Sequence, residues 1–287
     1  MKNAVVYAVS GAHIMLVASS MASLIDHYES REPLDILVMS EKLRPGDVSL
    51  IREIPKMYPG KAPISVFVWA APGIMQQLKD YHNERFPQVV LWRLFAASAF
   101  SSYARIVYLD NDTVVCDDIS PMFDTVDQDH PVAAVKDFYF QIHQGGTTYF
   151  NSGVLVFDTA AFNQTVTPQK LIDLVNTTSY RYPDQSILNQ VFEGKIHYLS
   201  YRYNFQKNDL WINNWAMKQN ADLTQAIVDE RSHTVIRHFV EYEMNSMPWQ
   251  HLAVYDSFEQ KFWEYQAQVH HFFNERSIAL GLNDDEK

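Results

Sequence analysis

Short apolar segments separated by helix-like stretches are the feature that most constrains the fold of this chain. Residues 4–9, 34–39 and 64–69 have the length and apolar character of buried strands. Residues 13–27 follow the first segment with apolar side chains at helical spacing, as expected of a crossover helix. This alternation is typical of an α/β sheet rather than an all-α or all-β fold. Further strands are predicted at 105–109, 132–135, 154–157, 196–199 and 235–239, in one mixed sheet, and further helices at 89–100, 169–176, 184–192 and 255–273.

The chain shows no boundary that would divide it into two bodies. Its 287 residues are 47% apolar, which is enough for a sizeable core. Neither an internal repeat nor a low-complexity linker interrupts them. We therefore predict one α/β domain over residues 1–250, with residues 251–287 forming a C-terminal helix and tail packed on it.

Charge and composition restrict the partners and the compartment. With 23 basic and 34 acidic residues the formal net charge is -11, and no basic face is evident, so nucleic acid is not an expected partner. No apolar run is long enough to span a bilayer, and the acidic C-terminal region opposes stable attachment to an anionic membrane. A lone cysteine, Cys116, and a first segment typical of a core strand favour a cytoplasmic protein.

Two carboxylates follow the predicted strand at 105–109. Side chains alternate along an extended chain, so Asp110 and Asp112 can point the same way and hold one divalent cation. They would lie at the carboxyl end of a buried strand, where open α/β sheets place their ligands. A cation held by so few protein ligands keeps positions for substrate phosphates. Asp-Asn-Asp after a strand is equally typical of a polar turn, and these residues alone leave both interpretations open.

Four motifs in a fixed order extend this observation over most of the chain. Residues 93–112 resemble the region around a metal-binding DxD motif, and residues 149–158 contain Phe-Asn-Ser-Gly-Val. Residues 184–189 begin with Asp-Gln, and His238-Phe239 precedes Pro248-Trp249. In this set the chain resembles glycosyltransferase family 8, which includes glycogenin and bacterial lipopolysaccharide galactosyl- and glucosyltransferases. The resemblance implies a GT-A fold, a Rossmann-like nucleotide-sugar-binding mixed sheet flanked by helices, with a C-terminal helical extension.

The resemblance also implies a metal site and a donor site. Asp110, Asp112 and His238 would hold Mn²⁺ or Mg²⁺, and an imidazole beside carboxylates suits manganese better. The donor, a UDP-sugar, would be bound by Ala8, Ser10, Arg93, Asp110, Asn111, Asp112, Asn151 and Asp184. The residue types alone leave a core histidine at 238 and a snorkelling arginine at 93 as alternatives.

The catalytic candidates implied by the resemblance are Asn151, Asp184 and Gln185. The first two would orient sugar hydroxyls, and Gln185 would lie near the anomeric carbon. Without the other motifs, Asn151 is equally compatible with a plain turn and Asp184 with a helix N-cap. The family retains the anomeric configuration. Because an amide is a poor nucleophile, a front-face route is favoured, in which the departing diphosphate oxygen deprotonates the acceptor, although Asp137 or Asp184 could act as a nucleophilic carboxylate.

Two positions depart from the family pattern. Ser10 stands where many relatives carry a uridine-binding aspartate, and a hydroxyl makes a weaker, uncharged hydrogen bond. Met247 stands where the family's lysine would contact a phosphate, and residues 240–247 contain no lysine or arginine. The candidates to replace that cation are Arg237, His251 and Arg202.

The function predicted is transfer of a hexose, glucose or galactose, from a UDP-sugar to a glycan or glycosylated-protein acceptor with retention. Residues 198–215 contain Trp211 and Trp215, and aromatic faces stack on sugar rings, although packing against the terminal helix would also explain them. Two alternatives are a weakly active or inactive nucleotide-sugar-binding partner protein, which the changes at Ser10 and Met247 motivate, and a metal-dependent nucleotide-sugar hydrolase. The sequence does not define the oligomeric state.

Overall fold

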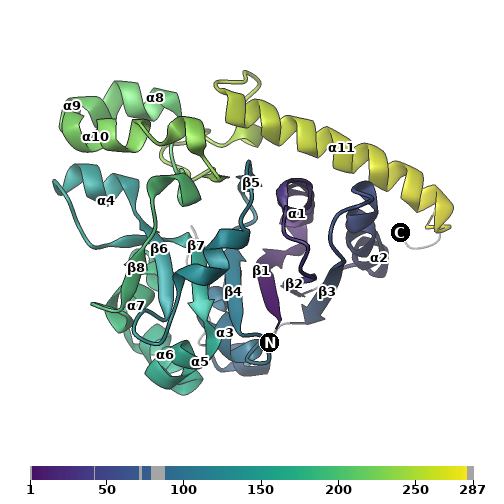
Figure 1. Cartoon of the computed structure of the whole chain (residues 1–287), viewed down its shortest axis with the longest axis horizontal. Helices are drawn as coiled ribbons and strands as arrows, with labels where there is room; N and C mark the ends of the chain where they lie inside the picture. The colour runs from purple at the N-terminus through teal and green to yellow at the C-terminus, as the bar shows by residue number, and fades with distance from the viewer. Residues whose placement is uncertain (1, 42, 71–72, 79–87, 283–287) are drawn as a thin grey trace.

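A seven-stranded mixed sheet lies at the centre of the computed structural model, which describes residues 2–41, 43–70, 73–78 and 88–282. The described residues form the strands β1 Asn3–Ser10, β2 Leu34–Glu41, β3 Ile64–Ala70, β4 Arg105–Leu109, β5 Thr113–Val115, β6 Val132–Lys136, β7 Phe150–Asp158, β8 Ile196–Tyr198 and β9 Ile236–His238. All of them except β5 and β9 belong to this sheet. The strand order is β3-β2-β1-β4-β7-β6-β8. β1 to β4 are parallel, and β7 runs antiparallel between β4 and β6 (Figure 1). The α/β prediction is confirmed.

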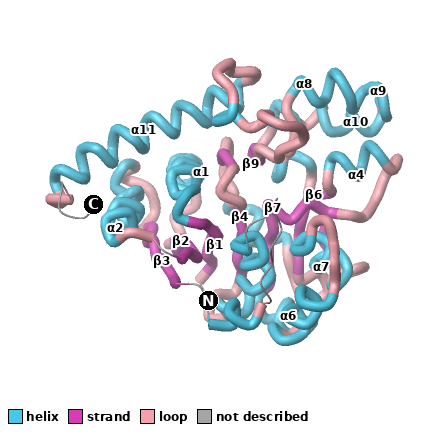
Figure 2. Tube along the Cα trace, turned by 180° about the vertical axis from the view of Figure 1, so that it is seen from behind, coloured by secondary structure: helices cyan, strands magenta, loops and turns pink. Residues whose placement is uncertain are grey.

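Helices cover both faces of this sheet. They are α1 Ile14–His27, α2 Pro45–Glu53, α3 Ala96–Ala99, α4 Phe138–His143, α5 Thr159–Thr165, α6 Pro168–Thr177, α7 Pro183–Val191, α8 Asp209–Trp211, α9 Met217–Gln219, α10 Ala221–Val228 and α11 Ser257–Ala279. α1 and α11 lie above the strands in Figure 1, and α3, α5 and α6 lie below them. α4 and α8 to α10 gather at one end of the molecule, as the view from behind also shows (Figure 2).

The alternation of side chains along β1 explains why both faces need cover. Val5 and Tyr7 belong to the hydrophobic core under α1 and α11, whereas Ala4 and Val6 belong to the core on the opposite face. A strand buried on both faces is apolar at every position, as residues 4–9 are. The nearly continuous apolar segments of the sequence therefore correspond to the central strands.

The C-terminal helix α11 is fixed to the first part of the chain. The carboxylate of Asp256 caps its first turn by accepting from the backbone N–H groups of Phe258 and Glu259, each at 2.9 Å. The hydroxyl of Tyr265 donates to Asp26 on α1 at 2.7 Å. Among the described residues, none of the helices combines the length and apolar character needed to cross a bilayer. The predicted tail at 283–287 lies outside the described residues, and the division at residue 250 stays a prediction.

Two predicted elements differ from the structure. Residues 235–239 were expected in the main sheet, but β9 instead pairs antiparallel with β5 in a separate two-stranded sheet. The reason is that β5 follows the turn at 110–112 and leaves the line of β4, so it offers β9 a partner outside the main sheet. Residues 89–100 form a 3₁₀ helix at Gln88–Phe95 and only then the short helix α3. Valine, tryptophan and phenylalanine in this stretch have reduced α-helix propensity.

Candidate active site

A cavity of about 780 Å³ opens at the carboxyl ends of β1 and β4. The start of β7, the first turn of α7 and the end of β9 also contribute to its walls. Of the residues predicted for the site, those that line the cavity are Ala8, Arg93, Asp110, Asn111, Asp112, Asn151, Asp184, Gln185 and His238. Ser10 is not among the described residues that line it. The Ser10 hydroxyl lies 3.4 Å from Nδ1 of His13, which does.

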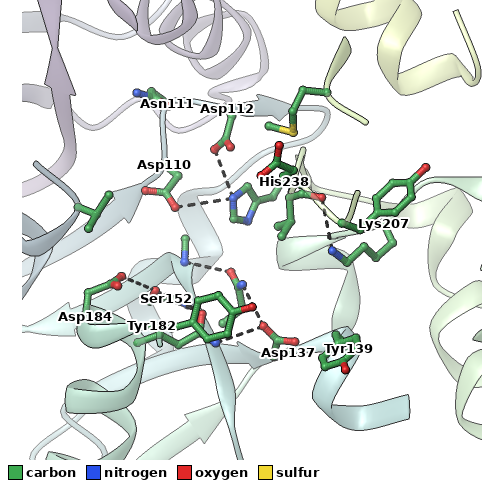
Figure 3. A pocket seen from close by; sticks show the side chains of 18 of the residues that line it. Asp110, Asn111, Asp112, Asp137, Tyr139, Ser152, Tyr182, Asp184, Lys207 and His238 are labelled. Atoms are coloured by element: carbon green, nitrogen blue, oxygen red, sulfur yellow. Dashed lines mark hydrogen bonds and ion pairs between the residues drawn. The ribbon is translucent and has the colours of Figure 1, made fainter. Parts of the chain in front are cut away.

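Asp110, Asp112 and His238 form a cluster of potential metal ligands. Figure 3 shows the three side chains pointing toward one another. One ligand atom from each lies within 4.8 Å of the others, and Nε2 of His238 is 3.3 Å from Oδ1 of Asp112. The pairing of Thr113 with His238 between β5 and β9 brings these distant positions together.

The donor atoms of this cluster fit a divalent cation. Oδ1 of Asp112 is buried and has no hydrogen-bond partner among the described residues. A buried polar atom without a partner is costly, and a cation would satisfy it. Two carboxylates and one imidazole are a ligand set suited to Mn²⁺ or Mg²⁺. The cluster therefore offers the ligand atoms that a divalent cation would need.

Asn204 fixes the orientation of the His238 ring. Its side-chain oxygen lies 3.1 Å from Nδ1 of His238, and an amide oxygen can only accept, so the proton belongs to Nδ1. The lone pair of Nε2 then faces the two aspartates, as metal ligation requires. Asn204 is completely buried and lies in the connection after β8, where no sequence motif marked it.

Gly153 makes room for the cluster. A Cβ atom added there would lie 2.1 Å from Cε1 of His238 and 2.7 Å from Oδ2 of Asp110. Real Cβ atoms do not approach other atoms so closely, so any larger residue would displace the histidine, the aspartate or the strand. The glycine of the Phe-Asn-Ser-Gly-Val motif is therefore required by close packing against the metal-ligand candidates.

Arg93 joins two of the aspartates that line the cavity, Asp110 and Asp184. Its guanidinium pairs with Asp110 at 2.7 Å and with Asp184 at 3.1 Å, and it also donates to the backbone oxygen of Ser152 at 2.7 Å. Its side chain is buried, so these contacts exclude the snorkelling alternative. Burial disfavours the charged guanidinium, but Asp110, Tyr108 and Asp184 together outweigh this effect and raise the pKa of Arg93. For Asp110 burial acts in the other direction and raises the pKa of the carboxyl, although the nearby Arg93 opposes that rise.

A hydrogen-bond network holds the catalytic candidates. Gln185 accepts from the backbone N–H of Ser152 at 3.1 Å and donates to Asp137 at 3.2 Å. Asp137 also accepts from the amide of Asn151 at 3.3 Å, and Asp184 accepts from the hydroxyl of Ser152 at 2.8 Å. Asp184 lies in the first turn of α7, whose N-cap is Tyr182. These amide and carboxylate groups therefore have defined orientations at the cavity wall.

None of the three cations considered as substitutes for the family's lysine lines the cavity. Arg237 donates to the backbone oxygen of Phe205 at 2.9 Å, His251 contacts its own loop, and Arg202 donates to Tyr203. The cavity is instead lined by Lys207, which no motif indicated. Trp211 and Trp215 also line the cavity rather than only packing against the terminal helix.

Solved structures of similar shape identify the class of this fold. The glycosyltransferase GlyE of Streptococcus pneumoniae superimposes with a TM-score of 0.70 and 24% identity, covering 100% of this chain and 66% of that chain. The galactosyltransferase LgtC, solved in complex with donor and acceptor sugar analogues, gives a TM-score of 0.69 and 18% identity, covering 92% of this chain and 95% of that chain. The mixed sheet with its acidic cavity is thus the GT-A fold of glycosyltransferases.

The sequence comparisons narrow this class to one family. The chain belongs to glycosyl transferase family 8, whose family model matches residues 4–253. The glycosyltransferase GlyA of Streptococcus pneumoniae is 32% identical over 199 residues, which is 67% of this chain and 25% of that protein. The matched region spans 25%, 48% and 41% of the lengths of three such curated relatives, so the chain corresponds to part of each. The family prediction is confirmed.

Proposed function

We propose that this chain is a metal-dependent retaining hexosyltransferase that moves glucose or galactose from a UDP-sugar to a glycan or glycosylated-protein acceptor. Family membership supports glycosyl transfer. One observation supports metal-dependent transfer from a nucleotide sugar in particular. The cluster of Asp110, Asp112 and His238 lines the same cavity as Asn151 and Gln185. That arrangement supplies a cation site and a set of fixed polar groups beside it.

Asp110, Asp112 and His238 would hold the cation. A bound Mn²⁺ or Mg²⁺ would neutralise charge on the donor diphosphate and make it a better leaving group. Asn204 keeps the imidazole in the required tautomer. Arg93 holds Asp110 and Asp184 at a fixed separation and balances part of their charge.

Asp184, Asn151 and Gln185 would bind and orient the hexose. The network through Ser152 and Asp137 fixes these side chains before the donor arrives, which lowers the cost of ordering the site. The same network supports a front-face route. Both Asp137 and Asp184 already accept hydrogen bonds from neighbouring side chains, which weakens either carboxylate as a nucleophile.

The aromatic wall of the cavity supports a sugar as the acceptor. The ring of Tyr139, which is 41% exposed, stacks on Trp215 with centroids 5.5 Å apart and an interplanar angle of 16°. The ring centroid of Trp211 lies 4.9 Å from that of Trp215. Aromatic rings beside polar groups are typical of carbohydrate-binding surfaces, because sugar rings carry both apolar and polar surface.

The test is calorimetric binding of UDP, GDP, UDP-glucose and UDP-galactose, each with Mn²⁺ and with a chelator. We expect one UDP-hexose to bind only in the presence of metal and Asp112→Asn to abolish that binding. Asp117→Asn, just beyond β5 but exposed and outside the cavity lining, is the matched control and should bind normally. Equal binding with metal and with chelator would refute the metal assignment. Release of free hexose that no acceptor suppresses would favour the hydrolase.

A further inference from the structure

A buried lysine reaches the cavity from the connection between β8 and α8. Lys207 is only 5% exposed, and its ammonium lies 3.4 Å from the backbone oxygen of Val240. Its side chain passes the rings of Trp211 and Tyr242, with the ammonium 5.7 and 5.6 Å from their centroids. Figure 3 shows Lys207 on the same side of the cavity as His238. Packing against two rings holds the ammonium in place.

The backbone explains why this lysine lies beside the metal-ligand cluster. Phe205 forms a parallel bridge with Arg237, and the backbone N–H of His238 donates to the oxygen of Phe205 at 3.0 Å. Two residues further along both segments, Lys207 meets Val240. Backbone contacts therefore hold the segment of Lys207 against β9, the strand that carries His238.

The charge of the cavity favours a phosphate-binding role for this side chain. Among the described residues, the lining has more acidic than basic side chains, namely Asp110, Asp112, Asp137, Asp184, Glu241 and Glu243 against Arg93, Arg181 and Lys207. Arg93 is held by Asp110 and Asp184, and the guanidinium of Arg181 lies over the ring of Tyr182. A diphosphate entering such a cavity requires cationic partners. Lys207 is the lysine that the lining offers.

We propose that Lys207 binds the diphosphate of the nucleotide donor and so supplies the cation that Met247 does not. Met247 lines the same cavity and is 7% exposed, but its side chain is apolar. The inference rests on the proposed function, because it takes a nucleoside diphosphate as the ligand. It adds a donor-binding residue from a connection that carries none of the four motifs.

The experiment compares the binding of UDP and of uridine, both in the presence of Mn²⁺, to the unmodified chain and to Lys207→Met. We expect the affinity for UDP to fall by about tenfold to a hundredfold, as for loss of a hydrogen bond to a charged group, and the affinity for uridine to be unchanged. Lys218→Met removes the same charge from an exposed position outside the cavity lining and should leave both affinities unchanged.

Three outcomes would count against the proposal, and they are distinguishable. Unchanged UDP affinity in Lys207→Met would overturn the role of Lys207 alone. Equal losses for UDP and uridine would show that Lys207 only supports the cavity wall. Absence of UDP binding to the unmodified chain would overturn the proposed function and this inference together. If Lys207→Met does not fold, as judged by circular dichroism, Lys207→Gln replaces it with the same expectations.

Discussion

Asn204 connects the His238 ring to Asn151, two residues that line the cavity. Its side-chain oxygen lies 3.1 Å from Nδ1 of His238, and its amide nitrogen donates to the side-chain oxygen of Asn151 at 3.0 Å. The network continues through Asp137 to Gln185. One buried amide therefore orients both a potential metal ligand and a residue proposed to bind the sugar.

Asn204→Ala should weaken Mn²⁺ binding by about tenfold to a hundredfold, because the imidazole loses the partner that sets its tautomer and ring orientation. Titration of the protein with Mn²⁺, followed by electron paramagnetic resonance of the free ion, measures this. Asn163→Ala is a suitable control, because Asn163 donates to the backbone oxygen of Ala97 away from the cavity. Equal Mn²⁺ affinity in Asn204→Ala and the unmodified chain would contradict the prediction.

Gly153→Ala should disrupt the cluster, since the added methyl group would overlap His238 and Asp110. We expect loss of Mn²⁺-dependent UDP binding and a decrease of about 1–3 kcal/mol in the free energy of unfolding, as for overpacking of a core. Gly73→Ala is the control, because nothing lies within 4 Å of the added Cβ there. Urea denaturation and calorimetry give the two quantities. A stable Gly153→Ala variant with normal UDP binding would rule out this packing constraint.

Arg93→Lys should be destabilising although it preserves the charge. A single ammonium has no planar fork with which to contact Asp110, Asp184 and the oxygen of Ser152 together. The expected loss in the free energy of unfolding is on the order of 1–3 kcal/mol. Arg105→Lys is the matched control, because its partner Asp124 is 83% exposed and such pairs contribute about 0–1 kcal/mol. Similar losses in both variants, measured by urea denaturation, would argue against a special role for the buried arginine.

The thiol of Cys116 should react slowly while the chain is folded. Burial raises its pKa from 9.0 to about 11, and the thiolate is the reactive form. Between about pH 8 and 9 the thiolate is then roughly fifty to a hundred times scarcer in the folded than in the unfolded chain. Alkylation by iodoacetamide, followed by mass spectrometry, should accelerate with pH up to about 11 in the native protein and level off near 9.0 in urea. A native rate that levels off near the same pH as in urea would contradict the assigned burial.

The cavity-lining positions of Asp110, Asn151, Asp184 and His238 could be anticipated because motifs mark them. Asp110 follows a buried strand, and strand ends are where α/β sheets place their ligands. The other three motifs, in their expected order, indicated Asn151, Asp184 and His238, and these residues line the same cavity as Asp110. Periodicity likewise located the main strands, since a strand buried on both faces is apolar throughout.

Asn204 and Lys207 could not be found in the same way. Each lies outside the four motifs, in a connection without regular periodicity, and acts through contacts with residues far along the chain. The pairing of β5 with β9 was also missed, because three-residue strands carry too little pattern to reveal their partner. Local sequence therefore indicated the ligand atoms but not the groups that orient them.

The two-stranded sheet of β5 and β9 also affects the order in which the parts of the molecule fold. It closes a very long stretch of chain, from Thr113 to His238, with only three residue pairs. Closing so large a loop costs entropy that a few backbone hydrogen bonds repay poorly. These contacts should therefore form late in folding, after the main sheet has brought their flanks together. A cation or nucleotide that bridges the two strands would bind only the finished structure and shift the folding equilibrium toward it.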